Sequence, residues 1–168
     1  HKKGDHGTAW DAKALLQAAL QGINIGLLSE AGMPAVADPG SSLVRAAHSL
    51  GLAVVPLVGP CSLVLALAAS GLNGQSFAFV GYVPQDSAQR NHHLVALEKV
   101  ALQSGQTQIL IETPYRNAAV MTAMLGAFKD STRLAVCSGL TLPQMQIQSL
   151  RVADWKRLQT TLDKHTPV

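Results

Sequence analysis

A long loop between two regular segments is the feature that most constrains how this chain folds. Residues 23–28 are mostly apolar and predict a buried strand, and residues 43–50 carry a helical pattern closed by Gly51. The connection between them, 29–40, is rich in glycine, proline and acidic residues. Connections in α/β units usually take about 2–6 residues. Long loops at the carboxyl ends of strands are where α/β sheets bind ligands.

A second loop of the same kind follows the next apolar run. Residues 53–57 predict a strand, and the segment 58–62 (VGPCS) leads into a helix predicted over 63–69. The strand–helix–strand order predicts parallel pairing with a right-handed crossover. Because parallel strands end at the same edge of a sheet, we expect the two loops to share one pocket.

Periodicity and turn residues predict the remaining elements. A helix is expected over 12–20, with Thr8 as its cap and Asp11 completing a capping box. A long helix at 88–104 is expected to bury an apolar face made of Leu94, Leu97, Val100 and Ala101. Further helices are expected at 115–128 and 154–164, and strands at 77–82, 108–112, 133–138 and 146–151.

Together these elements predict an α/β fold of two lobes, 1–83 and 84–168, whose sheets are mainly parallel or mixed. A polar break at 84–87 marks the boundary between the lobes. The chain begins with His1 rather than Met, and we expect its first lobe to be incomplete at the amino terminus. A composition of 48% hydrophobic and 14% charged residues provides for a substantial core.

The sequence also limits which binding partners and which cellular compartment we expect for this chain. No apolar stretch is long enough to span a bilayer and no signal peptide opens the chain, so we expect a cytoplasmic protein without a membrane partner. Cys61 and Cys137 lie far apart and form no CxxC pair, so we expect neither a disulfide nor a metal site. The formal net charge of +3 is compatible with a nucleic-acid partner, but the basic residues are dispersed rather than clustered.

The loops fit none of the common catalytic templates. The phosphate loop, the dinucleotide fingerprint and the nucleophile elbow are all absent. The loop glycines either let a small polar ligand approach the backbone or serve only as turns. Ser62 is expected to cap its helix. Cys61 is a nucleophile candidate, with no histidine nearby in the sequence.

A second candidate site is the segment 112–116 (ETPYR), at the end of one predicted strand and the start of the next helix. Glu112 is a candidate to accept a proton or to orient a substrate hydroxyl. Arg116 is a candidate to bind a phosphate through two parallel N–H donors. The alternative is an acid at a helix start and a surface arginine.

Taken in order along the chain, these segments resemble the tetrapyrrole methylase superfamily, most closely its ribosomal RNA small-subunit methyltransferase I branch. The resemblance covers nearly the whole chain. It rests on Ser29-Glu30-Ala31-Gly32-Met33-Pro34, Ala37-Asp38-Pro39-Gly40, Leu57-Val58-Gly59-Pro60-Cys61-Ser62, Ala66-Leu67-Ala68-Ala69-Ser70-Gly71 and Glu112-Thr113-Pro114-Tyr115-Arg116. The chain departs from the family at three positions: it has Glu30 where the family has Asp, Cys61 where Ser is common, and Gly139 where the family has Glu. It also lacks the family's Pro-x-Gly-Asn loop.

The resemblance implies two α/β lobes that bind S-adenosylmethionine in the cleft between them, in a homodimer. Carried over by position, the cofactor-binding residues are Ala31, Gly32, Met33, Pro60, Cys61, Ser62, Leu140 and Thr141. The resemblance identifies no catalytic base, for which Glu112 and Arg116 are the candidates.

The expected function is an S-adenosylmethionine-dependent methyltransferase that acts on RNA, at a ribose hydroxyl of ribosomal RNA. One alternative is a methylase of a tetrapyrrole or another small molecule. The other is a non-catalytic dimeric module that binds the cofactor or RNA without turnover.

Overall fold

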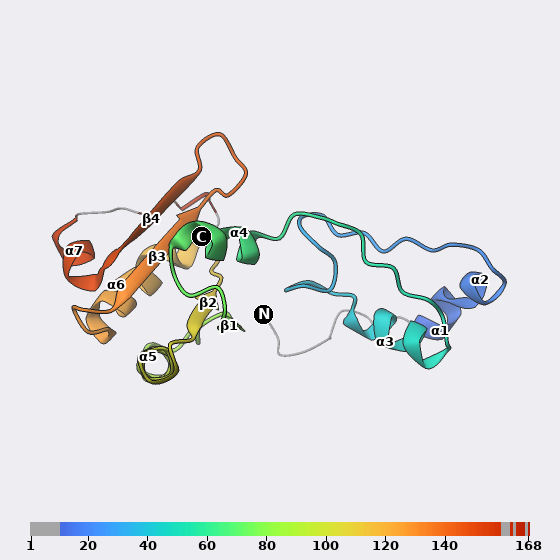
Figure 1. Ribbon diagram of the computed structural model, residues 1–168, viewed down its shortest axis with the longest axis horizontal. Helices are drawn as coiled ribbons and strands as arrows, with labels where there is room; N and C mark the ends of the chain where they lie inside the picture. Colours follow the sequence, from blue (N-terminus) through green and yellow to red (C-terminus); the bar gives the residue numbers. More distant parts are fainter. Residues whose placement is uncertain (1–10, 159–161, 163, 167) are drawn as a thin grey trace. The chain divides into compact units, whose positions relative to one another are not determined.

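The computed structural model describes residues 11–158, 162, 164–166 and 168 (Figure 1). The chain divides into two compact units, one ending at Cys61 and the other beginning at Ser62. The elements of the first unit are α1 (Ala12–Leu15), α2 (Gln17–Leu20) and α3 (Ser41–Ser49). Those of the second are α4 (Ser62–Ser70), β1 (Phe77–Gly81), α5 (Ser87–Ser104), β2 (Thr107–Leu110), the 3-10 helix η1 (Pro114–Arg116), α6 (Asn117–Ala127), β3 (Arg133–Ser138), β4 (Gln146–Arg151) and α7 (Val152–Arg157).

The core of the first unit is a small helical cluster. Leu16, which separates α1 from α2, packs against Leu43 and Ala47 of α3. Asp11 begins α1, since its side chain accepts hydrogen bonds from the backbone N–H groups of the first turn at 3.1 and 3.2 Å. The helix predicted over 12–20 is therefore two short helices, the first of which is capped by Asp11. The predicted Thr8 cap lies outside the described residues.

The two apolar runs of the first unit are not β-strands, so the prediction of a parallel pair at 23–28 and 53–57 is wrong. Over the described residues, neither run forms a ladder with any segment. Leu28 is 90% exposed and Leu57 is 79% exposed. A ladder depends on a partner backbone brought from elsewhere in the chain, which the pattern within a run does not encode. Pro56 also removes one of the N–H donors that a ladder uses.

The second unit contains two separate two-stranded sheets. β1 pairs parallel with β2, and β3 pairs antiparallel with β4 in a hairpin (Figure 1). The register of the parallel pair shifts by one residue between Phe79 and Gly81. The predicted mixed α/β fold class is confirmed, and each predicted strand of this unit forms within two residues of its predicted limits. β1 and β2 share one unit, and the predicted lobe boundary after residue 83 stays a prediction.

The helices of this unit follow their local signals. The side chain of Asp86 caps α5, and Gly105 ends it in a left-handed conformation with φ of 68°. The helix predicted from 115 starts as the 3-10 turn η1. Of the predicted helix at 154–164, residues up to Arg157 belong to α7, and 159–161 and 163 lie outside the described residues.

The buried face of α5 differs from the predicted one. Leu94 is fully buried against Val120 and Met124 of α6, as expected. Val100, however, is 43% exposed, and Glu98 is buried in its place. A carboxylate is tolerated there because it has hydrogen-bond partners, which the hydrophobic pattern of the helix does not show.

Glu98 joins three elements through the loop 129–132. Its Oε1 accepts hydrogen bonds from the backbone N–H of Lys129 at 2.7 Å and from the hydroxyl of Thr132 at 2.5 Å. The carbonyl of Thr132 in turn accepts from the N–H of Val152, the first residue of α7. Glu98 therefore positions the loop that connects α6 to β3 and the start of α7.

Glu98→Ala is expected to lower the free energy of unfolding of the second unit by about 1–3 kcal/mol, because the N–H of Lys129 and the half-buried hydroxyl of Thr132 lose their acceptor. Urea unfolding monitored by Trp155 fluorescence, in a Trp10→Phe background, measures this unit alone. The control is Lys99→Ala on the exposed face of the same helix, which should change stability by no more than about 0.5 kcal/mol. Equal unfolding midpoints for Glu98→Ala and the parent would contradict this role.

Candidate functional site

The loop 29–40 of the first unit is held by its own hydrogen bonds. The hydroxyl of Ser29 donates to the carbonyls of Ala31 and Gly32, at 3.3 and 2.9 Å. The N–H of Val36 donates to the carbonyl of Met33 at 3.3 Å. These bonds leave Ala31 and Gly32 exposed and Met33 half-buried. The loop is therefore a hydrogen-bonded turn rather than an irregular connection.

The two glycine-rich loops of the first unit approach each other, although in the described part of the chain they do not follow the paired parallel strands from which a shared pocket was predicted. A Cβ added to Gly32 would lie 3.7 Å from the carbonyl oxygen of Pro60. A Cβ added to Gly59 would lie 3.4 Å from Cγ of Met33. The structure therefore brings together Gly32, Met33 and Pro60, all predicted cofactor residues.

Backbone strain is concentrated in the predicted cofactor loops. Among the described residues, the only non-glycine residues with positive φ are Ala35 at 64°, Ala37 at 55° and Thr141 at 71°. Ala35 and Ala37 follow Met33 in the loop 29–40, and Thr141 is itself a predicted cofactor residue. Such a conformation costs an L-residue about 1–3 kcal/mol and tends to persist at functional sites. The strain marks these two loops as candidates for ligand contact.

Gly40 closes the first of these loops at the start of α3. Its φ is 136°, and an added Cβ would lie 2.9 Å from Cδ2 of Leu27. The positive φ disfavours any larger residue, and the added Cβ would also require the Leu27 side chain to move. The requirement for glycine at this position comes from the path of the chain into α3.

The remaining predicted cofactor residues are in different places. Cys61 is half-buried at the end of the first unit, and Ser62 is the exposed first residue of α4. Half-buried Leu140 and exposed Thr141 lie in the turn of the β3–β4 hairpin, where the N–H of Leu142 donates to the carbonyl of Gly139 at 2.9 Å.

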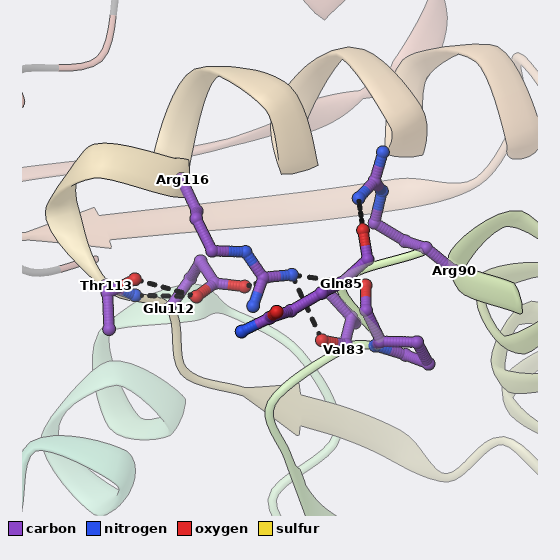
Figure 2. A network of polar contacts seen from close by, with 7 residues as sticks. Val83, Gln85, Arg90, Glu112, Thr113 and Arg116 are labelled. Atoms are coloured by element: carbon purple, nitrogen blue, oxygen red, sulfur yellow. Dashed lines mark hydrogen bonds and ion pairs between the residues drawn. The ribbon is translucent and has the colours of Figure 1, made fainter. Parts of the chain in front are cut away.

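The segment 112–116 forms a buried polar network in the second unit (Figure 2). Glu112 is 4% exposed. Its Oε1 accepts hydrogen bonds from the backbone N–H and the hydroxyl of Thr113, at 2.8 and 3.2 Å. Its Oε2 lies 3.3 Å from Nη2 of Arg116 in an ion pair. Glu112 and Arg116 are therefore partners of each other.

Arg116 also binds the chain just beyond β1. Its Nη2 donates to the carbonyls of Val83 and Pro84, both at 3.1 Å. Nη1 of Arg90 donates to the next carbonyl, that of Gln85, at 3.0 Å. Figure 2 shows the two guanidinium groups reaching the same short segment. The part played by Arg90 was not predicted, and no sequence signal points to it beyond the polar break at 84–87.

Two further site types can be assessed over the described residues. No group of three or more histidine, cysteine or acidic side chains is placed to hold a metal ion there. Within the same residues, no helix is both long enough and apolar enough to cross a membrane.

Burial raises the pKa of the Cys137 thiol, which keeps it protonated. Its Sγ lies 3.9 Å from the carbonyl of Ala66, so Cys137 is a packing residue.

Comparison with known proteins identifies the family. The family Tetrapyrrole (Corrin/Porphyrin) Methylases matches residues 1–154. The chain belongs to this family. The solved methyltransferase CobJ has a similar fold, with a TM-score of 0.57 at 18% identity, covering 93% of this chain and 67% of that one.

Several relatives carry one name, Ribosomal RNA small subunit methyltransferase I. The Vibrio cholerae protein is 35% identical over 150 residues, which are 89% of this chain and 51% of that protein. The Mesorhizobium japonicum protein is 39% identical over 146 residues, 85% of this chain and 48% of that protein. The chain therefore spans about half the length of the relatives it matches.

Arg116→Met is expected to lower the free energy of unfolding of the second unit by about 3–5 kcal/mol, because it leaves the buried Glu112 carboxylate without its counterion. Adding Glu112→Gln should recover part of that loss, since the amide oxygen still accepts from Thr113. Urea unfolding monitored by Trp155 fluorescence measures both variants. An Arg116→Met variant as stable as the parent would show that the pair does not hold this unit together.

Proposed function

We propose that this chain acts as an S-adenosylmethionine-dependent methyltransferase on RNA, at a ribose hydroxyl of ribosomal RNA. The observation that carries the proposal is the strained loop 29–40, which contacts Pro60 of the second loop in a chain of a methylase family. The names of the relatives from Vibrio cholerae and Mesorhizobium japonicum support RNA as the acceptor. The likeness to CobJ supports the fold alone.

The residues of the two loops fit the cofactor. Ala31, Gly32 and Pro60 are exposed and small, so a nucleoside can approach the main chain closely. We propose that these residues hold S-adenosylmethionine together with Met33, Cys61, Ser62, Leu140 and Thr141. When bound, S-adenosylmethionine supplies a methyl group that is already activated by positive sulfur. The tasks left to the protein are to align the acceptor and to exclude water.

We propose Glu112 and Arg116 as positioning residues rather than as groups that touch the reacting atoms. The carboxylate is buried and already accepts from Thr113, and Nη2 of Arg116 is shared between Glu112 and two backbone carbonyls. A guanidinium engaged in this way has less capacity for a substrate phosphate. Its effect on catalysis would come through the path of the segment 83–85.

We also propose a homodimer in the cytoplasm. The apolar runs 23–28 and 53–58 expose large side chains, among them Leu28 at 90% and Leu57 at 79%. Contiguous exposed apolar surface commonly marks a protein–protein interface. A second copy of the chain is the partner that the resemblance to the family implies.

Isothermal titration of S-adenosylhomocysteine into the protein made from its complete reading frame tests the cofactor assignment. We expect saturable binding, weakened about tenfold by Gly32→Ala, because a left-handed conformation costs an L-residue about 1–2 kcal/mol and the loop must rearrange to relieve that strain. Gly74→Ala is the matched control, since an added Cβ there meets nothing within 4 Å. Absence of binding by the parent protein would overturn the cofactor assignment.

Methyl incorporation distinguishes the RNA acceptor from a small molecule. Labelled S-adenosylmethionine is supplied with ribosomal RNA from cells lacking the gene, and in parallel with a tetrapyrrole. We expect label in the RNA and none in the tetrapyrrole. Label only in the tetrapyrrole would show that the methyl acceptor is a small molecule rather than RNA. Cofactor binding without methyl transfer to either acceptor would favour a non-catalytic binding module.

A further inference from the structure

We propose that an open hollow beside α3 binds a phosphodiester of the RNA substrate. The hollow has a volume of about 550 Å³ and is lined by α3 and by Ala35. The inference rests on the RNA acceptor proposed above, and it adds the surface that holds the RNA backbone. Both lining segments belong to the first unit.

One side of α3 supplies most of the lining. The lining residues of the helix are Ser41, Val44, Arg45, His48 and Ser49. They are spaced mainly by three and four positions, which brings side chains to one face of a helix. Leu43 and Ala47 are buried against Leu16. This packing fixes the helix and leaves the polar side accessible.

The lining carries positive charge and no carboxylate. Arg45 and His48 are exposed, and over the described part of the chain neither is in an ion pair. A guanidinium binds phosphate oxygens through parallel N–H donors, and an imidazole N–H can donate beside it. The Ser49 hydroxyl donates to the Arg45 carbonyl at 3.0 Å, so it serves the helix itself. Recognition of an anion therefore falls to the Arg45 guanidinium, with the His48 imidazole beside it.

The shape of the hollow favours a phosphate within a polymer over a free anion. It is open to solvent, so the nucleotides on either side of a bound phosphate can remain outside. Most of its lining surface is apolar, and Ala35 and Val44 contribute to the part against which a ribose can lie. A small free anion would contact only the exposed Arg45 and His48, and contacts between exposed charged groups are weak, whereas a nucleotide also places its ribose against Ala35 and Val44.

The hollow adjoins the proposed cofactor loop. Ala35 belongs to the loop 29–40, has a φ of 64°, and donates its N–H to the carbonyl of Pro39 at 3.3 Å. A strand of RNA held on α3 would therefore run beside the loop that we propose for S-adenosylmethionine. This places the binding of the RNA backbone and of the cofactor on adjacent segments of one unit.

The test measures RNA binding by the double variant Arg45→Gln/His48→Gln in the protein made from its complete reading frame. The probe is small-subunit ribosomal RNA from cells lacking the gene, titrated at several salt concentrations. We expect the Kd to rise about tenfold and the magnitude of the slope of log K against log salt to fall by about 0.7, because that is the contribution of one phosphate contact on single-stranded RNA. Binding of S-adenosylhomocysteine should be unchanged, and glutamine should preserve the helix.

Lys99→Gln removes one exposed helical cation from the second unit and is the matched control, with an expected change of less than about twofold. Equal Kd and salt slope for the double variant and the parent would overturn this inference while methyl transfer to RNA persisted. A parent protein that binds S-adenosylhomocysteine but no RNA would overturn the RNA acceptor as well. Inorganic phosphate that saturates the parent as tightly as RNA does would overturn the assignment to a polymer.

Discussion

The second unit depends on one buried ion pair. Glu112 carries its charge out of water, which is unfavourable unless the carboxylate is paired and hydrogen-bonded. Arg116 meets that need, and the same guanidinium holds the carbonyls of Val83 and Pro84. The end of β1, the chain after β2 and the start of α6 therefore share one charged group. Separating the chain after β2 from the start of α6 would leave a buried charge unpaired, and moving the end of β1 away would cost the guanidinium two hydrogen bonds.

Elements with strong local signals could be predicted from the sequence. The capping side chain of Asp86 and the left-handed Gly105 bound α5 at the expected positions, and β3 and β4 have their predicted limits. In these cases the information lies in a few neighbouring residues, so that sequence pattern and structure agree.

What could not be predicted depends on partners distant in the sequence. The runs 23–28 and 53–57 have the composition of strands, but the structure gives them no ladder over the described residues. Burial of Glu98 depends on donors in the loop 129–132, and the role of Arg90 depends on a carbonyl that it meets only in the folded chain. The strain at Ala35 and Ala37 has no signature in residue type, since alanine rarely takes a positive φ.

The register shift in the parallel pair has a consequence for how this region can change during evolution. Between Phe79 and Gly81 the first strand advances two residues while its partner advances one. Gly81 has a φ of 73° and leads the chain toward the carbonyls that Arg116 holds. Removing one residue here would regularise the ladder but turn those carbonyls toward the opposite edge of the strand, since successive carbonyls point to alternate sides of it. Side chains in this strand can therefore vary more freely than its length, and insertions or deletions should be rarer here than substitutions.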